Sequence, residues 1–212
     1  MDFQDFLKYL PKIEKETLPS VEAHIKMASI ERISSLRDGS YAKEGLREAA
    51  VMMLFYPKNS IVHLALILRN ASIGLHSSQI AFPGGKVEPE DLNFEQTALR
   101  ETFEEIGIPP ERIQVIRAFS EVYIPPSKFL VYPFLGVSQT ELVFMPSEDE
   151  VAGMIELPLD VFLDDKNLTT ASIKASYTDE IQVPAFQFNG HIIWGATAMM
   201  LNELKETIKK VL

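Results

Sequence analysis

The sequence predicts one mixed α/β domain that carries a helical extension at its N-terminus. Apolar residues at helical spacing occupy the first 45 residues, and strand-like segments rich in Val, Ile and aromatic residues dominate from residue 46 onward. A chain of 212 residues can bury a sizeable core. Because the sequence has no repeat and no linker-like tract, we expect residues 1–45 and 46–212 to form an extension and a main domain within one globular unit.

Two helical stretches precede the strands. The apolar residues of the first recur at helical spacing: Phe3, Phe6, Leu7 and Leu10. Pro11 is expected to end this helix, because proline lacks the N–H that a helix interior uses. Residues 20–36 form the second stretch, and a loop containing "RDGS" follows it.

Six later segments have the composition of β-strands, and a helix closes the chain. The first two strands are hinged at the turn-like "PKNS". The strands are predicted at residues 47–57, 62–69, 113–123, 129–137, 182–189 and 191–195. The closing helix, residues 196–212, places its apolar residues on one face: Leu201, Leu204, Ile208 and Val211.

Composition excludes several functional classes. The formal net charge of −10 argues against binding to nucleic acids or anionic membranes. The longest apolar run, residues 61–68, is far shorter than the roughly 18 residues that span a bilayer. Without cysteine the chain forms no disulfide or thiolate zinc site, whereas oxygen-ligand sites for Mg²⁺ or Mn²⁺ remain available. Since the N-terminus has no signal-like hydrophobic block, we expect a cytoplasmic protein.

Residues 93–107 predict a helix with well-specified ends. Asn93 can cap it, and Gln96 completes a capping-box pattern. Gly107 suits the left-handed position that ends a helix, and the prolines that follow prevent continuation. An apolar stripe should pack on a sheet: Phe94, Ala98, Thr102 and Ile106, widened by Leu99 and Phe103.

Three carboxylates gather near the C-terminal end of this helix, where the helix dipole disfavours negative charge. Glu101 lies three residues before Glu104 and four before Glu105, so the side chains can converge on one spot. Arg100 can relieve part of the repulsion through a salt bridge with Glu104. A hard divalent cation would relieve the rest, because Mg²⁺ and Mn²⁺ prefer carboxylate oxygens.

The segment "AFPGGKVEPED" before the helix decides between two interpretations of these acids. Adjacent glutamates are by themselves usually solvated surface, and the charge run around Glu150 has the same default interpretation. Gly84 and Gly85, however, let the backbone approach a ligand with no Cβ in the way. A glycine loop that leads into an acidic helix can hold a metal-bound diphosphate.

These residues resemble the Nudix box, G-x5-E-x7-R-E-U-x-E-E-x-G-U, in which U is apolar. The matching positions are Gly85, Arg100, Glu101, Glu104, Glu105, Gly107 and Ile108. Asp91 stands where the first glutamate is expected, and eight residues instead of seven separate it from Arg100. Thr102 replaces an apolar residue. We expect Asp91 to cap the turn before the helix and not to bind metal.

With this extra residue, the box resembles that of the coenzyme A pyrophosphatase branch of the family, whose pattern is FPGGK-x-[DE]-x-x-D…ALRE-x-x-EEIG. A second pattern of that branch, L-L-T-x-R-[SA]-x3-R-x3-G-x3-F-P-G-G, is matched by Arg69 and residues 82–85. Gly74 replaces its second arginine and Ser78 replaces its glycine. The resemblance extends over about residues 47–204, and the two replacements bear on the substrate more than on the fold.

The resemblance implies an α/β/α sandwich around a mixed sheet and a metal-dependent hydrolase. Water would attack one phosphorus of a nucleoside diphosphate derivative, and coenzyme A or acyl-coenzyme A would yield 4′-phosphopantetheine and adenosine 3′,5′-bisphosphate. Mg²⁺ or Mn²⁺ would be held by carboxylates and one carbonyl: Glu101, Glu104, Glu105 and Gly85, with Gly84 as the other candidate carbonyl. One of the glutamates could act as base, and Arg100 would orient a glutamate.

Substrate binding would need local positive charge and close backbone approach. The candidates are Arg69, His76, Lys86, Lys128, Gly84 and Gly85. Trp194 and Met199 are expected in the core and not in a ligand platform. Two alternatives stay open: hydrolysis of ADP-ribose or another nucleoside diphosphate derivative, and a binding module without turnover. The intact box glutamates favour an enzyme, and a homodimer is left open.

Overall fold

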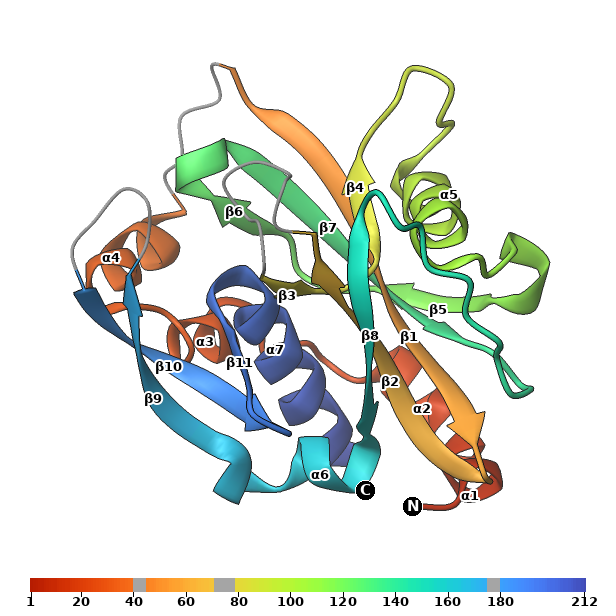
Figure 1. Cartoon of the computed structure of the whole chain (residues 1–212). Helices are drawn as coiled ribbons and strands as arrows, with labels where there is room; N and C mark the ends of the chain where they lie inside the picture. The colour runs from red at the N-terminus through yellow and green to blue at the C-terminus, as the bar shows by residue number, and fades with distance from the viewer. Residues whose placement is uncertain (40–44, 71–78, 175–179) are drawn as a thin grey trace.

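The computed structural model describes residues 1–39, 45–70, 79–174 and 180–212, and it places a mixed sheet between two helical layers (Figure 1). The sheet has the strand order β3-β2-β1-β7-β5, with β4 beside β1, β6 beside β7 and β8 beside β2. Its strands are β1 (Arg47–Lys58), β2 (Ile61–Arg69), β3 (Ile80–Ala81), β4 (Gly84–Lys86), β5 (Gln114–Ala118), β6 (Val122–Ile124), β7 (Phe129–Val137) and β8 (Val151–Pro158). The pair β1–β7 is parallel and the other pairs are antiparallel.

Strand β1 explains the layered arrangement, because both of its faces are buried. Alternate side chains enter two separate cores, as the period of two in a strand requires. One core, which also contains residues of α7 (Gly195–Val211), receives Ala49, Val51, Met53 and Phe55. The other, which contains residues of α5 (Phe94–Ile106), receives Ala50, Met52, Leu54 and Tyr56. The predicted sandwich around a mixed sheet is therefore confirmed.

The N-terminal extension folds as four short helices and not as two. They are α1 (Phe3–Leu7), α2 (Leu10–Lys15), α3 (Ser20–Ile25) and α4 (Ile30–Asp38). Pro11 does not simply end a helix, because it lies in the first turn of α2, where a missing N–H costs no hydrogen bond. The expected helix over residues 20–36 is interrupted at residues 26–29, where Met27 is buried in the core and Ser29 is extended.

Buried polar contacts attach α3 to the rest of the molecule. Glu203 of α7 is fully buried, and it accepts hydrogen bonds from the Ser20 backbone N–H at 3.0 Å and from the Ser120 hydroxyl at 2.6 Å. His24 of α3 contacts the same carboxylate at 3.2 Å. The extension also contributes Phe3, Phe6, Leu10 and Ile13 to the core of the α7 side. The N-terminal helices thus pack as part of the main fold.

The later part of the chain differs from prediction in three places. Residues 113–123 form two strands, β5 and β6, since the chain leaves the sheet at residues 119–121 and Ser120 turns toward Glu203. Strand β8 and helix α6 (Leu159–Leu163) were not predicted, and β8 forms through its pairing with β2. A second sheet contains β9 (Leu168–Lys174), which was not predicted, together with β10 (Glu180–Phe188) and β11 (His191–Trp194). No helix among the described residues is long and apolar enough to cross a membrane.

Candidate active site

Helix α5 begins and ends as predicted. The Asn93 side chain accepts a hydrogen bond from the Gln96 backbone N–H at 2.9 Å, and Gly107 takes a left-handed conformation with φ of 72°. Ala98 and Ile106 are fully buried against the sheet. Phe103, in contrast, is 51% exposed and does not widen the buried stripe. It lies about 100° around the helix from Thr102, beyond the face that meets the sheet.

Strand β4 brings the two glycines against β1 and α5. Gly84 and Gly85 pair with Val51 and Ala50. A Cβ at Gly84 would lie 2.6 Å from the Val51 Cα, and Gly84 has a φ of 152°, so only glycine fits there. A Cβ at Gly85 would lie 2.5 Å from the Glu101 Cδ. The glycine pair therefore lets the Glu101 carboxylate lie directly on the backbone of β4.

Glu105 is the most deeply buried acid of the box. Its carboxylate accepts hydrogen bonds from the Gly84 backbone N–H at 2.7 Å and from the Arg69 guanidinium at 3.1 Å. Burial raises the pKa of Glu105 to about 7, although Arg69 and the Gly84 N–H act in the opposite direction. Arg69, which the sequence assigned to substrate binding, is thus also the charge partner of a box glutamate.

Arg100 connects the loop before α5 with the glutamates on it. Two parallel hydrogen bonds of 2.9 Å join its guanidinium to Asp91. The same guanidinium donates to Glu101 and Glu104 at 3.0 Å each, and to the Lys86 carbonyl at 3.0 Å. The predicted pair with Glu104 is confirmed, and the stronger bidentate pair with Asp91 was not foreseen.

Asp91 is engaged by its own loop and by α5. Besides Arg100, it accepts hydrogen bonds from the Glu88 backbone N–H and the Thr97 hydroxyl, both at 2.9 Å. The Arg100 hydrogen bonds hold the pKa of Asp91 well below its usual range. Its side chain is only 5% exposed, and its oxygens face Arg100 and Thr97. This arrangement agrees with the expected role in closing the turn.

The glutamates of the box form a region of high negative charge that is only partly compensated. Burial raises the pKa of Glu101, and repulsion from Glu104 and Glu150 adds to that rise. Glu150 reaches the region because the Ser147 backbone N–H donates to the Glu105 carbonyl at 3.0 Å, which holds residues 147–150 against the end of α5. Hard carboxylate oxygens that repel one another, beside a backbone without a Cβ, fit a divalent cation such as Mg²⁺.

The expected convergence of Glu101, Glu104 and Glu105 on one point is not present in this conformation. Glu101 and Glu104 meet at Arg100, whereas Glu105 turns toward Gly84. Within the four described segments, no group of three or more acidic or histidine side chains is close enough to hold an ion. Glu104 has an exposed side chain, so a change of its rotamer could bring its oxygens toward Glu101.

A cavity of about 920 Å³ opens beside this acidic region. Four residues assigned to substrate binding line it together: Arg69, Gly84, Gly85 and Lys86. Lys128 does not line it, and His76 lies outside the described residues. Trp194 and Met199, which we expected only in the core, also line the cavity. No local pattern in the sequence could have shown this, because these residues come from a distant part of the chain.

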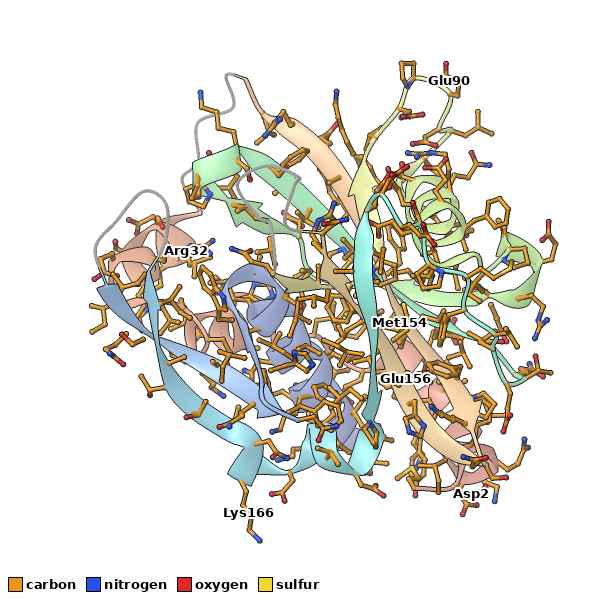
Figure 2. The ribbon with its side chains drawn as sticks, viewed as in Figure 1. Asp2, Arg32, Glu90, Met154, Glu156 and Lys166 are labelled. Atoms are coloured by element: carbon orange, nitrogen blue, oxygen red, sulfur yellow. The ribbon has the colours of Figure 1, made fainter. Side chains whose placement is uncertain are left out.

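Two further cations on the cavity wall were missed by sequence analysis. Arg47 donates two hydrogen bonds to the Ser127 carbonyl, at 3.1 and 2.6 Å, and its guanidinium lies 4.1 Å from the centre of the Phe129 ring. Arg32 donates to the Tyr123 carbonyl. Figure 2 shows Arg32 on α4, on the side of the sheet away from α5.

Comparison with known proteins identifies the family. A NUDIX domain model matches residues 45–178. The chain belongs to the Nudix family. The Nudix hydrolase NudL of Pectobacterium atrosepticum, described as uncharacterized, is 33% identical over 164 residues, which cover 74% of this chain and 81% of the relative. The NudL protein of Citrobacter koseri, also described as uncharacterized, is 33% identical over 162 residues, with the same two coverages.

Solved structures of Nudix proteins share the fold of this chain. The Nudix hydrolase RenU from M. smegmatis has a TM-score of 0.54 at 18% identity, covering 78% of this chain and 88% of that chain. A MutT protein from Methanosarcina mazei has a TM-score of 0.53 at 14% identity, covering 80% and 99%. As a member of its family, this Nudix hydrolase acts on pyrophosphate bonds of nucleoside diphosphate derivatives. Nudix hydrolases generally use divalent metal cations.

Proposed function

We propose that this Nudix hydrolase cleaves the diphosphate of coenzyme A or acyl-coenzyme A. The products are 4′-phosphopantetheine, with its acyl group where present, and adenosine 3′,5′-bisphosphate, and the metal is Mg²⁺ or Mn²⁺. The sequence supports this substrate through "FPGGKVEPEDLNFEQTALRETFEEIG", which has the spacing of the coenzyme A branch.

The cavity beside the box is the observation that carries the proposal. Its volume of about 920 Å³ is near the upper end of the range for small-molecule sites, which supports a large substrate such as coenzyme A. Lys86 and Arg69 line the cavity next to Gly84 and Gly85. These groups supply positive charge for phosphates in a protein whose net charge is −10.

The box residues divide the chemical work. Glu101, Glu104 and Glu105 would hold the metal ion, and the Gly85 carbonyl would be a further ligand. Arg100 orients Glu101 through its anchorage on Asp91. Arg69 and the Gly84 N–H orient the buried Glu105. When bound, divalent ions neutralise the diphosphate oxygens, polarise phosphorus and activate a water molecule.

Turnover of a substrate panel tests the proposal. The purified protein would be assayed with Mg²⁺ or Mn²⁺ on coenzyme A, acyl-coenzyme A, ADP-ribose, NADH and dinucleoside polyphosphates. We expect the highest kcat/KM for a coenzyme A compound. ADP-ribose is the rival substrate, because Gly74 and Ser78 depart from the branch pattern. If the kcat/KM for ADP-ribose is tenfold or more higher, the coenzyme A assignment is wrong.

A matched pair of variants on α5 tests the role of the box. Glu104→Gln removes one carboxylate of the proposed metal site, and we expect kcat to fall by about 100-fold or more. Glu95→Gln removes an exposed carboxylate from the first turn of the same helix, and kcat should stay unchanged. Equal activity in both variants would contradict the assignment of Glu104.

A further inference from the structure

The cavity has walls that lie outside the part of the chain matched by the family model. That match covers residues 45–178. Met27, Ser29 and Arg32 of the N-terminal extension line one side of the cavity. Ile181 and Trp194, together with α7 residues such as Met200, line another. Segments before and after the matched region therefore shape this space, while the Nudix box lies beside it.

The cavity is continuous with the acidic region. Arg69 and Gly84 line the cavity and also bind the Glu105 carboxylate. Gly85 lines it and lies against the Glu101 carboxylate. A diphosphate held beside Gly85 would thus have one of its substituents directed into the cavity. This continuity favours a part of the substrate as the occupant over a separate ligand.

Apolar side chains dominate the cavity away from the diphosphate end. They come from six strands, from α7 and from the residues that join the elements, and they include Met27, Phe82, Phe129, Ile181, Trp194 and Met200. Lys86 lies next to Gly85 at the diphosphate end, and the three arginines on the wall donate hydrogen bonds to protein groups: Arg69 to Glu105, Arg47 to the Ser127 carbonyl and Arg32 to the Tyr123 carbonyl. We call this cavity the chamber. Its composition favours a hydrocarbon group as ligand, because the burial of apolar surface is the main source of binding energy that an apolar wall offers.

We propose that this chamber binds a long apolar arm joined to the diphosphate, and that Met27 limits the length of the arm. This proposal rests on the proposed function, and it means that the enzyme prefers a medium-chain or long-chain acyl-coenzyme A to unacylated coenzyme A. Met27 is suited to this role because its side chain lines the cavity and is only 4% exposed, so the surrounding core holds it in place. It lies in the interruption between α3 and α4. Each buried methylene should favour binding by about threefold to fourfold.

A chain-length series tests the inference. The kcat/KM values for coenzyme A and for its acetyl, butanoyl, octanoyl and hexadecanoyl thioesters would be compared. We expect the octanoyl compound to exceed coenzyme A by at least tenfold. Met27→Phe should shift the preference toward shorter chains, whereas Met145→Phe should leave it unchanged, because Met145 is 67% exposed and does not line the cavity.

Trp194 provides an independent readout that needs no turnover. It is the single tryptophan of the chain and lines the chamber, so its fluorescence reports on occupancy. Octanoyl-coenzyme A should change the Trp194 emission at lower concentration than coenzyme A does. If Met27→Phe fails to fold, Ala196→Leu, on another part of the wall, provides the second narrowed chamber.

The outcomes separate this inference from the function on which it rests. Turnover of coenzyme A with no dependence on chain length, and with equal fluorescence responses, would overturn the inference and leave the proposed function in place. Turnover of ADP-ribose with none of any coenzyme A compound would overturn both. If neither Met27→Phe nor Ala196→Leu alters the chain-length preference, a different surface binds the arm. That result would also overturn the inference.

Discussion

Replacement of Gly85 by alanine tests how closely the position of Glu101 must be controlled. The new Cβ would lie 2.5 Å from the Glu101 Cδ, whereas ordinary contact begins at 3.4 Å, so the carboxylate must move by about 1 Å. A misplacement of about 1 Å can cost on the order of 100-fold in rate when reacting groups are held by the protein. We therefore expect kcat/KM to fall by about 100-fold.

The fold of Gly85→Ala should survive, because the obstructing atoms belong to a side chain that can rotate and Gly85 does not need a left-handed conformation. Gly153→Ala is the matched control, since a Cβ there meets no atom within 4 Å. Activity on the best substrate and thermal unfolding would be measured for both variants. Full activity in Gly85→Ala would refute the proposed role of Glu101. If the Tm of this variant also falls strongly, its loss of activity is due to misfolding and not to the position of Glu101.

Three other substitutions test single interactions. Asp91→Asn should lower the free energy of unfolding by about 3 kcal/mol at pH 7, because it breaks a buried bidentate ion pair with Arg100. Since the pKa of Asp91 is depressed in the folded state, its stabilisation is present above an unfolded pKa near 3.9. The difference from the parent in urea unfolding should therefore shrink as pH falls from 5 to 2, and a constant difference would contradict this. Arg69→Gln should raise the pKa of Glu105 above about 7 in metal-free carboxyl NMR, because Arg69 opposes the effect of burial; an unchanged titration would exclude the coupling. Asn93→Ala should cost about 1 kcal/mol of stability by removing the N-cap of α5, with kcat unaltered; a lost kcat would reveal a further role.

The sequence determined the local features of the site. Both ends of α5, the glycine pair of β4 and the Arg100–Glu104 pair follow from short-range geometry, so they were predictable. The strand-like composition of residues 47–57 likewise predicted the strand β1, although only the structure showed that both of its faces are buried. Each of these features depends on residues that lie within a few positions of one another along the chain.

Only the tertiary structure decided which distant groups meet. Arg69 and Glu105 are 36 residues apart, and their pairing depends on how β2 and α5 pack around β4. The same applies to the cavity wall, where Met27 and Trp194 lie far apart in sequence. Spacing rules extend over one or two turns of helix or along one strand, whereas burial and ion pairing depend on the whole packed arrangement.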